Sequence, residues 1–508
     1  MTSMKNIFLA PLGVLCILTI SVGEIQAENH FSPLREGNSS SNGLSSVNAG
    51  KVRTRIDSLR GKDDKVFAND DDYADKNKGR DRRRGRDEHE PLPLDQYPNV
   101  YNDYIQPVAT AIDYHNGMVY LFNYENDKLI IIDPTTLPGW PGNVPLQHTV
   151  MMPEGKKIYI TSDNTQDHPS YIIALNVNDI NWDTRLASLT VSAVLAADSP
   201  NNPSELPFVT PVNQVQAIPN WLIGRGTQIH GPTLLPYSDF LYFTEFTSDR
   251  IRVINHTTDQ FLGFDPIVIP GYTEQTHGVN FNRSGTIGLG TGYFFDNSVI
   301  DVYKPNRETG ELQTVGQIML GNEKKHAAFT HFVYWLDERY AVTASMQLDK
   351  TSLTPSTTNH IIPPSVWLLD TQEGTAKEIV KNTNHANGHG VFRSASDIAV
   401  VNGKLYIAEE DTLDYTFGND GYISVFDLTD REKPRFIKRL RPGFELPAGY
   451  SVAHTISPTP DHRHLLVASW VSGYVLKIDT ETDTVTKVWG PRDGLVKPHG
   501  IFAAGGLR

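Results

Sequence analysis

Cysteine is almost absent from this sequence of 508 residues. The one cysteine, Cys16, lies in an apolar N-terminal stretch. The rest of the chain therefore offers no disulfide, no thiolate metal site and no cysteine nucleophile. Any metal bound by this chain would have to be held by histidine and carboxylate side chains.

Positive charge is also in short supply. Asp and Glu outnumber Lys and Arg by 59 to 45, which gives a formal net charge of −14 and argues against nucleic acid as the main partner. Amphipathic helical periodicity is nearly missing, and no serine elbow, phosphate loop or zincin signature occurs. The 39 glycines, 32 prolines and 39% hydrophobic residues instead suit a globular protein of strands and turns.

Long apolar runs are confined to the N-terminus. Lys5, the apolar stretch 7–20 and the sequence Ile25-Gln26-Ala27 predict a cleaved secretory signal at 1–27, because the apolar run is short for a bilayer span. Residues 28–104 are rich in Ser, Asn, Gly and mixed charge and predict a disordered linker. We therefore expect a periplasmic or secreted protein without a membrane span in the mature chain.

From residue 105 onward the sequence repeats. One unit, "HGPTLLPYSDFLYFTEFTSDRIRVINHTTDQ" from His230, holds an apolar run, a turn, a β-rich run, a second turn and an alternating run that ends near Asn or Asp. Seven such units predict an all-β fold, a seven-bladed β-propeller over 105–508, with six or eight blades as the alternatives, since repeats of roughly 40–50 residues with several short strands are typical of propeller blades. The final fragment, 499–508, is expected to pair with the first blade and close the ring.

Most units begin with a histidine. Because the first strand of a propeller blade lines the central channel, residues at the heads of these strands should converge at one mouth. In the fifth unit the spacing favours His331 over His326, and His389 lies further from its next β-rich run than the others do. The predicted converging set is His148, His230, His277, His331, His389, His454 and His499.

This histidine set predicts a metal centre. A single such residue could equally hydrogen-bond blade backbone, but clustered neutral imidazoles need partners, which a metal supplies. Seven histidines exceed the ligands of one zinc, and an all-imidazole set without thiolate suits copper, so two or three copper ions are expected. Glu274, Glu245 and Asp296 lie near the same mouth and are candidate general bases, with turn capping as the alternative for each.

With the motifs "QHT", "IHG", "THG", "THF", "GHG", "AHT" and "PHG" in a seven-unit repeat, residues 105–508 resemble the copper propellers, which include thiocyanate dehydrogenase and the propeller domain of nitrous-oxide reductase. The chain lacks the adjacent histidine pair of nitrous-oxide reductase and the cysteine of its cupredoxin domain, so thiocyanate dehydrogenase is the nearer match. The resemblance implies multinuclear copper held by the seven histidines, with carboxylates and a lysine assisting; Lys324, Lys325 and Lys497 are nearby.

The same resemblance implies oxidation of a small anion, thiocyanate, to cyanate and sulfur, with the electrons passed to an external acceptor such as a cytochrome. Two alternatives remain open. The unit "LYFTEFTSDRIRVI" is similar to the repeat of the streptogramin lyases, which are magnesium-dependent propellers with few histidines. A propeller that binds a protein partner without catalysis is the third possibility.

Overall fold

The computed structural model describes residues 106–163, 169–196, 229–245, 250–262, 267–268, 276–292, 299–322, 325–326, 330–346, 348–349, 361–362, 364–381, 395–410 and 421–504. The expected signal and linker, 1–104, lie outside these ranges. Within them, none of the helical segments is long and apolar enough to pass through a membrane.

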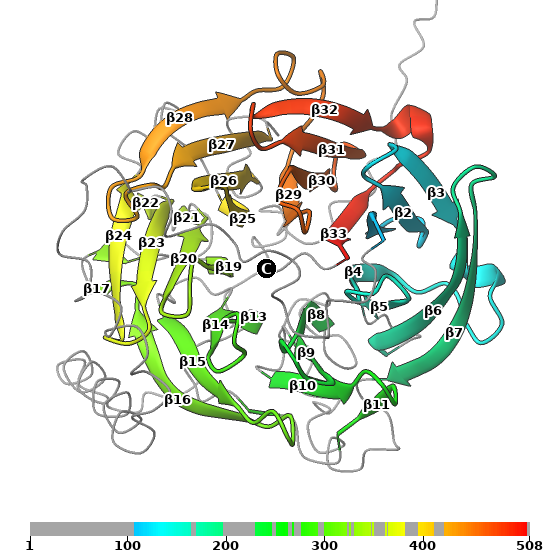
Figure 1. Cartoon of the computed structure of the whole chain (residues 1–508), viewed down its shortest axis with the longest axis horizontal. Helices are drawn as coiled ribbons and strands as arrows, with labels where there is room; N and C mark the ends of the chain where they lie inside the picture. The colour runs from blue at the N-terminus through cyan, green and yellow to red at the C-terminus, as the bar shows by residue number, and fades with distance from the viewer. Residues whose placement is uncertain are drawn as a thin grey trace, which may run out of the picture.

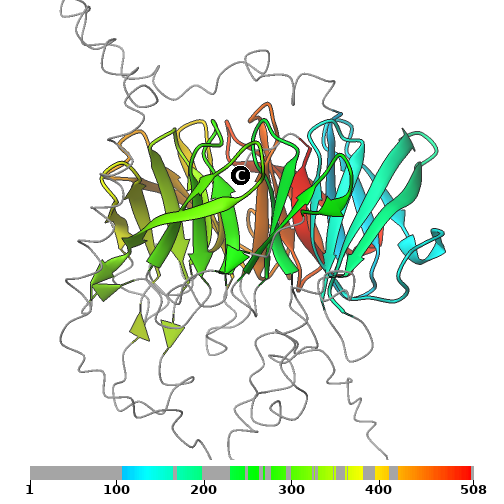
Figure 2. The ribbon, with the colours of Figure 1, turned by 90° about the horizontal axis from the view of Figure 1, so that it is seen from below.

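Seven antiparallel sheets stand around a central axis, which confirms the predicted all-β, seven-bladed propeller (Figure 1). Seen from the side in Figure 2, the strands run from one face of the disc to the other.

The strands of each blade are given from the innermost outward. Blade one consists of β33 (Pro498–Ala503), β1 (Val108–Asp113), β2 (Val119–Asn123) and β3 (Lys128–Ile132), and blade two of β4 (Leu146–Met151), β5 (Lys157–Ser162), β6 (Tyr171–Asn181) and β7 (Leu186–Ala196). Blade three consists of β8 (Ile229–Leu234), β9 (Phe240–Glu245), β10 (Arg250–Asn255) and β11 (Gln260–Phe261), with β12 (Ile267–Val268) also paired to β10, and blade four of β13 (Thr276–Phe281), β14 (Gly288–Gly292), β15 (Val299–Pro305) and β16 (Leu312–Met319).

Blade five consists of β19 (Thr330–Trp335), β20 (Tyr340–Ser345), β23 (Ser365–Asp370) and β24 (Thr375–Lys381). Blade six consists of β25 (Ala395–Val401), β26 (Lys404–Glu409), β27 (Tyr422–Asp427) and β28 (Arg435–Leu440). Blade seven consists of β29 (Ala453–Pro458), β30 (His464–Ser469), β31 (Tyr474–Asp479) and β32 (Thr484–Trp489). The smaller elements are β17 (Gly321–Asn322) with β18 (Lys325–His326), β21 (Leu348–Asp349) with β22 (Ile361–Ile362), and the 3-10 turns η3 (Pro134–Thr136) and η7 (Pro491–Asp493).

The ring closes between the two ends of the propeller. β33, from the end of the chain, is the innermost strand of blade one and pairs antiparallel with β1, with Ile112 opposite His499 and Asp113 opposite Pro498. In Figure 1 the red β33 accordingly lies beside the cyan strands of blade one. The predicted closure is confirmed, and it leaves no open sheet edge between the first and last blades.

Burial falls from the axis outward. The inner strands β4 and β29 are buried at every position, whereas the outer strands β28 and β32 consist mostly of exposed and partly exposed residues. An inner strand is covered on both faces by neighbouring blades, so any polar side chain in it is buried and needs a partner, whereas an outer strand lies closer to solvent. This gradient explains why the polar groups of the inner strands are the informative ones.

The Asn or Asp that ends the alternating run of many units begins a turn. Asn255 accepts hydrogen bonds at Oδ1 from the backbone N–H groups of Thr257 and Thr258, at 2.9 and 3.1 Å. Asp479 does the same for Glu481 and Thr482, at 3.1 and 2.8 Å. Such short side chains hold the tight turn that joins the third and fourth strands of a blade.

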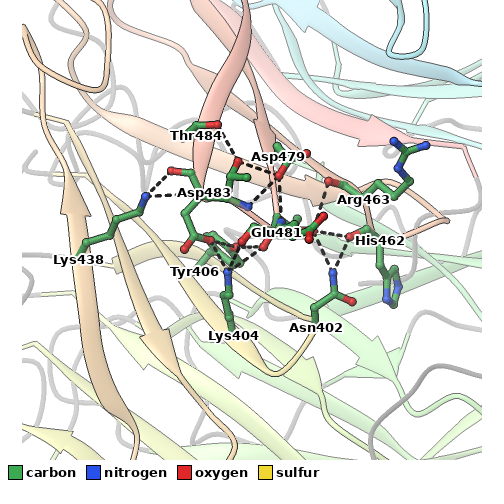
Figure 3. Close-up of polar contacts among 12 residues, drawn as sticks. Asn402, Lys404, Tyr406, Lys438, His462, Arg463, Asp479, Glu481, Asp483 and Thr484 are labelled. Carbon is green, nitrogen blue, oxygen red and sulfur yellow. Dashed lines mark hydrogen bonds and ion pairs between the residues drawn. The ribbon is translucent and has the colours of Figure 1, made fainter.

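Neighbouring blades are joined near these turns by polar contacts that occur at more than one blade junction; Figure 3 shows the contacts between blades six and seven. In blade six, Lys404 donates from Nζ to Asp483 at 2.9 Å and to the Thr480 carbonyl at 2.9 Å, and the Tyr406 hydroxyl also bonds Asp483. Lys157 and Tyr159 of blade two contact Asp259 of blade three in the same way. We call the first group, Lys404, Tyr406 and Asp483, the interblade clamp.

Candidate metal centre

Six of the seven predicted histidines meet around the axis in a closed ring. Each comes from the innermost strand of a different blade, and all six are buried. Successive ring centroids lie 4.6 Å (His499–His148), 5.0 Å (His148–His230), 5.1 Å (His230–His277), 3.8 Å (His277–His331), 5.6 Å (His331–His454) and 4.4 Å (His454–His499) apart. We call this set the histidine ring.

Blade six contributes a serine at the corresponding place. Its inner strand begins at Ala395, and the Ser396 hydroxyl lies 3.0 Å from His454 Nδ1 and 3.4 Å from His331 Nδ1. His389, which the sequence assigned to this position, lies outside the described residues. Of the two candidates in blade five, His331 is the one in the ring; His326 lies in β18, and its side chain is not described.

Irregularities in the inner strands accompany the ring positions. The register between first and second strands shifts between Thr276 and Gly278, between Ala395 and Asp397, and between Ala453 and Thr455. His277, Ser396 and His454 are the residues at these shifts, and His148 and His331 lie within slightly longer ones. Bulges of this kind turn a side chain away from the regular alternation of its strand. The ring residues of several inner strands can therefore face the axis together.

The glycine of the "HG" motifs lets neighbouring inner strands approach each other. Gly231 has φ +47°, and a Cβ there would lie 2.6 Å from the His277 carbonyl oxygen. Gly500 has φ +63°, and its Cβ would lie 3.0 Å from His148 Cα. A side chain at either position would push apart two strands that each carry a ring histidine.

Threonines of the second strands fix the histidine backbones. Thr244 of blade three donates to the His277 carbonyl at 2.8 Å, and Thr291 of blade four donates to the His331 carbonyl at 2.7 Å. Each contact joins one blade to the ring residue of the next blade. The ring is therefore held by backbone geometry as well as by side-chain packing.

The buried imidazoles are held neutral. Burial lowers the pKa of His148, His277 and His499 well below the ordinary value, and the neighbouring histidines lower it further. Burial likewise lowers the pKa of His230 to about 3. Desolvation and mutual repulsion both disfavour the imidazolium form, so lone pairs are available for an electrophile or a metal.

Besides the contacts of Ser396 with His331 and His454, two ring histidines have further hydrogen-bond partners on Nδ1. His499 is bonded to the Gln147 carbonyl, and His454 is bonded to the carboxylate of Glu410. An acceptor at Nδ1 leaves Nε2 with a free lone pair, as in histidines that bind metals through Nε2. His148 Nε2 is buried and has no hydrogen-bond partner among the described residues.

A second layer of side chains lies next to the ring. In each blade, the residue before the ring position pairs with the last residue of the second strand or lies next to that pair. The residue that follows the second strand therefore lies at the same mouth of the channel as the ring. In the described part these residues are Tyr114, Asp163, Met346, Glu410 and Trp470.

Asp163 is the most perturbed acid of this layer. Its Oδ2 accepts hydrogen bonds from Gln147 Nε2 at 2.6 Å and from the Tyr114 hydroxyl at 3.2 Å, and burial raises its pKa to about 7. Trp470 packs against His454 and His499, at centroid distances of 5.9 and 6.0 Å.

The predicted carboxylates are placed differently. Glu245 ends β9 and forms a buried ion pair with Arg252 on β10, so a guanidinium already compensates its charge. Glu274 and Asp296 lie outside the described residues. The general-base role of these three residues stays a prediction.

Sequence reasoning missed Asp163 and Glu410. Both directly follow a second strand, in "IYITSD" and "LYIAEE", and that position was the available signal. Glu409, one residue earlier, points elsewhere and bonds Ser424 at 2.6 Å and Arg439 at 2.8 Å. Successive strand residues face opposite sides, so a single position decides which carboxylate reaches the ring.

The donor set of the ring fits copper, which takes imidazole ligands readily. Buried neutral imidazoles, an Nε2 of His148 without a partner in the described part and a carboxylate behind His454 all agree with metal ligation. However, no group of three or more His, Cys, Asp or Glu side chains in the described ranges is arranged to hold an ion as the side chains stand. Ligation would therefore require imidazole side chains of the histidine ring to rotate.

No protein-family model matches the chain, and no curated protein matches it. Solved structures do match the chain. The chain is similar to a candidate 6-phosphogluconolactonase from Bacteroides fragilis, at 12% identity and a TM-score of 0.51 over 80% of this chain and 99% of that one. It is also similar to a functionally unknown protein from Desulfotomaculum acetoxidans, at 14% identity and a TM-score of 0.50 over 78% of this chain and 98% of that one. At these identities the likeness shows the propeller fold.

Proposed function

We propose that this protein is a copper-dependent oxidoreductase that acts on a small inorganic anion at the histidine ring. Thiocyanate is the proposed substrate; with water it would give cyanate, sulfur, two protons and two electrons, the electrons passing to an external carrier such as a cytochrome. The observation that carries the proposal is the ring itself, six buried imidazoles from six blades whose successive ring centroids lie 3.8–5.6 Å apart, four of them with lowered pKa values.

The chemistry of the ring supports copper over magnesium. Magnesium prefers oxygen ligands, whereas the ring presents nitrogen donors whose lowered pKa values keep them unprotonated at neutral pH. Copper bound there would supply a redox couple and lower the pKa of a bound water.

The chain's own residues would handle protons and access. Asp163, with a pKa of about 7, can take a proton at Oδ1, which has no hydrogen-bond partner among the described residues. Gln147 and Tyr114 hold its other oxygen in place. Trp470 and Tyr114 pack edge-to-face at 5.7 Å and cover the His454–His499 side of the ring.

Elemental analysis of the copper-loaded, desalted protein tests the proposal, with about two or three ions per chain expected from the donor count. Replacing both His277 and His454 with alanine should remove most of this copper and the thiocyanate-dependent reduction of an electron acceptor together. His115→Ala is the matched control, because His115 lies in an exposed turn of blade one.

Full copper loading in the double variant would contradict the assignment of the site. Absence of tightly held copper in the wild-type protein would leave the other two functions. Magnesium-dependent turnover would then favour a lyase, and absence of both would favour a binding propeller.

A further inference from the structure

Glu410 lies directly behind one member of the histidine ring. It follows the last residue of β26, and only 3% of its surface is exposed. Its Oε2 and His454 Nδ1 are within hydrogen-bond distance. Because a carboxylate oxygen only accepts, Nδ1 of His454 donates in this contact, which leaves Nε2 as the ring nitrogen that can bind a metal.

The neighbouring glutamate shows that this contact is specific. Glu409 is bonded by Arg439 and Ser424, so its negative charge is compensated within blade six. Among the described residues, the only basic side chain paired with Glu410 is His454. A buried carboxylate is costly unless it is paired with positive charge, and a cation held by His454 Nε2 would provide that charge.

Ser396 extends the unit to a second ring histidine. Its hydroxyl lies 3.0 Å from His454 Nδ1 and 3.4 Å from His331 Nδ1, in the blade whose described residues bring a serine to the ring position. Glu410 and Ser396 thus both contact His454 Nδ1, and Ser396 also reaches His331 across the widest gap of the ring, the 5.6 Å between the His331 and His454 centroids.

We infer that Glu410 is a positioning residue of the metal centre: its carboxylate fixes the tautomer and orientation of His454 so that Nε2 faces the site. The inference rests on the proposed function for its metal, but the hydrogen bond acts in the metal-free protein as well. Carboxylates that hold a ligating histidine in this way typically account for about 10- to 100-fold in metal affinity.

Two variants of similar volume separate positioning from packing. Glu410→Gln retains an acceptor oxygen without charge, whereas Glu410→Met retains the length without an acceptor. In the metal-free protein, ¹⁵N correlation spectra of the histidine side chains should show His454 protonated on Nδ1 in the wild type and in the Gln variant. The Met variant should lose this preference. His454→Gln identifies the signal, and circular dichroism verifies the fold of each variant.

Copper affinity is measured by competition with a chromophoric chelator. Relative to the wild type, it should fall about 10-fold in the Gln variant and about 100-fold in the Met variant. Asp163→Asn is the matched control, because Asp163 is the buried carboxylate at the equivalent place in blade two and its bonds go to Gln147 and Tyr114. It should leave the His454 signal unchanged.

An Nδ1 proton on His454 in the Met variant, together with unchanged copper affinity, would overturn the inference. Equal losses in the Gln and Met variants would also overturn it, since they would indicate packing alone. If the wild-type protein binds no copper, the proposed function fails, and the tautomers of the metal-free series still decide the role of Glu410.

Discussion

The interblade clamp and the histidine ring are both buried polar clusters that the repeat brings together, and they differ in how their charges are matched. In the clamp, the Lys404 ammonium and the Tyr406 hydroxyl both meet the Asp483 carboxylate (Figure 3). In the ring, imidazoles face other imidazoles, and each lowers the tendency of its neighbours to become charged. The clamp pairs opposite charges within the chain, whereas the ring gathers imidazoles that disfavour one another's charged form.

This difference separates a structural cluster from a functional one. A buried charge that meets its opposite stabilises the arrangement of blades, and nothing needs to be added to it. Six buried imidazoles in one channel gain little from facing one another, and a metal would accept their nitrogen lone pairs. The comparison predicts that the two clusters respond in opposite ways to pH, to metal and to substitution.

The largest expected effect is the response of the metal-free ring to acid. Since the folded-state pKa values of His148, His230, His277 and His499 lie below the unfolded value of about 6.5, the unfolded chain binds protons that the folded chain refuses. The unfolding free energy should therefore fall as pH drops below about 6.5, by up to about 1.4 kcal/mol per pH unit for each such histidine.

Urea unfolding of chelator-treated protein at several pH values between 7 and 5 measures this slope. His277→Gln should make it shallower, because one buried imidazole is removed, and bound copper should reduce it further. A pH-independent unfolding midpoint over this range would contradict the neutral, buried state of the ring.

The next largest effect is expected at the clamp. Asp483→Ala leaves Lys404 and Tyr406 without their shared carboxylate and should lower the unfolding free energy by about 3 kcal/mol, the size found when a buried ion pair loses one partner. Copper content should not change, because Lys404 begins β26 at the end opposite Glu410, and Asp483 lies in the turn between β31 and β32. Denaturant titration with elemental analysis measures both quantities.

Asp183→Ala is the control for this variant. Asp183 pairs with Lys128 at 2.6 Å, but its side chain is 93% exposed, so its loss should leave the unfolding midpoint unchanged. Equal effects of the two substitutions would show that burial does not distinguish the clamp from a surface ion pair.

Much of this architecture was predictable because the repeat encodes it locally. The apolar runs and the Asn or Asp turns specify the blades, and His277, for example, heads its run in the same way as His230 and His454 do. The bulges that turn these residues toward the axis depend on pairing between strands, and so does the choice of Glu410 over Glu409. Ser396 was missed because only the observed start of β25 identifies it as the seventh ring position.

The smallest expected effect links the two regions, since it changes the spacing of inner strands without removing any polar group. Gly500→Ala places a Cβ 3.0 Å from His148 Cα at φ +63°, and Gly403→Ala introduces a similar strain at φ +69° with nothing within 4 Å. Each should cost about 1–2 kcal/mol in unfolding free energy, because an L-residue is forced into the left-handed region.

Only Gly500→Ala should also weaken copper binding, because the added methyl group separates β33 from β4 and moves His499 away from His148. Denaturant titration and chelator competition on both variants measure the two effects. Equal copper affinities in the two variants would show that the close approach at Gly500 does not position the ring.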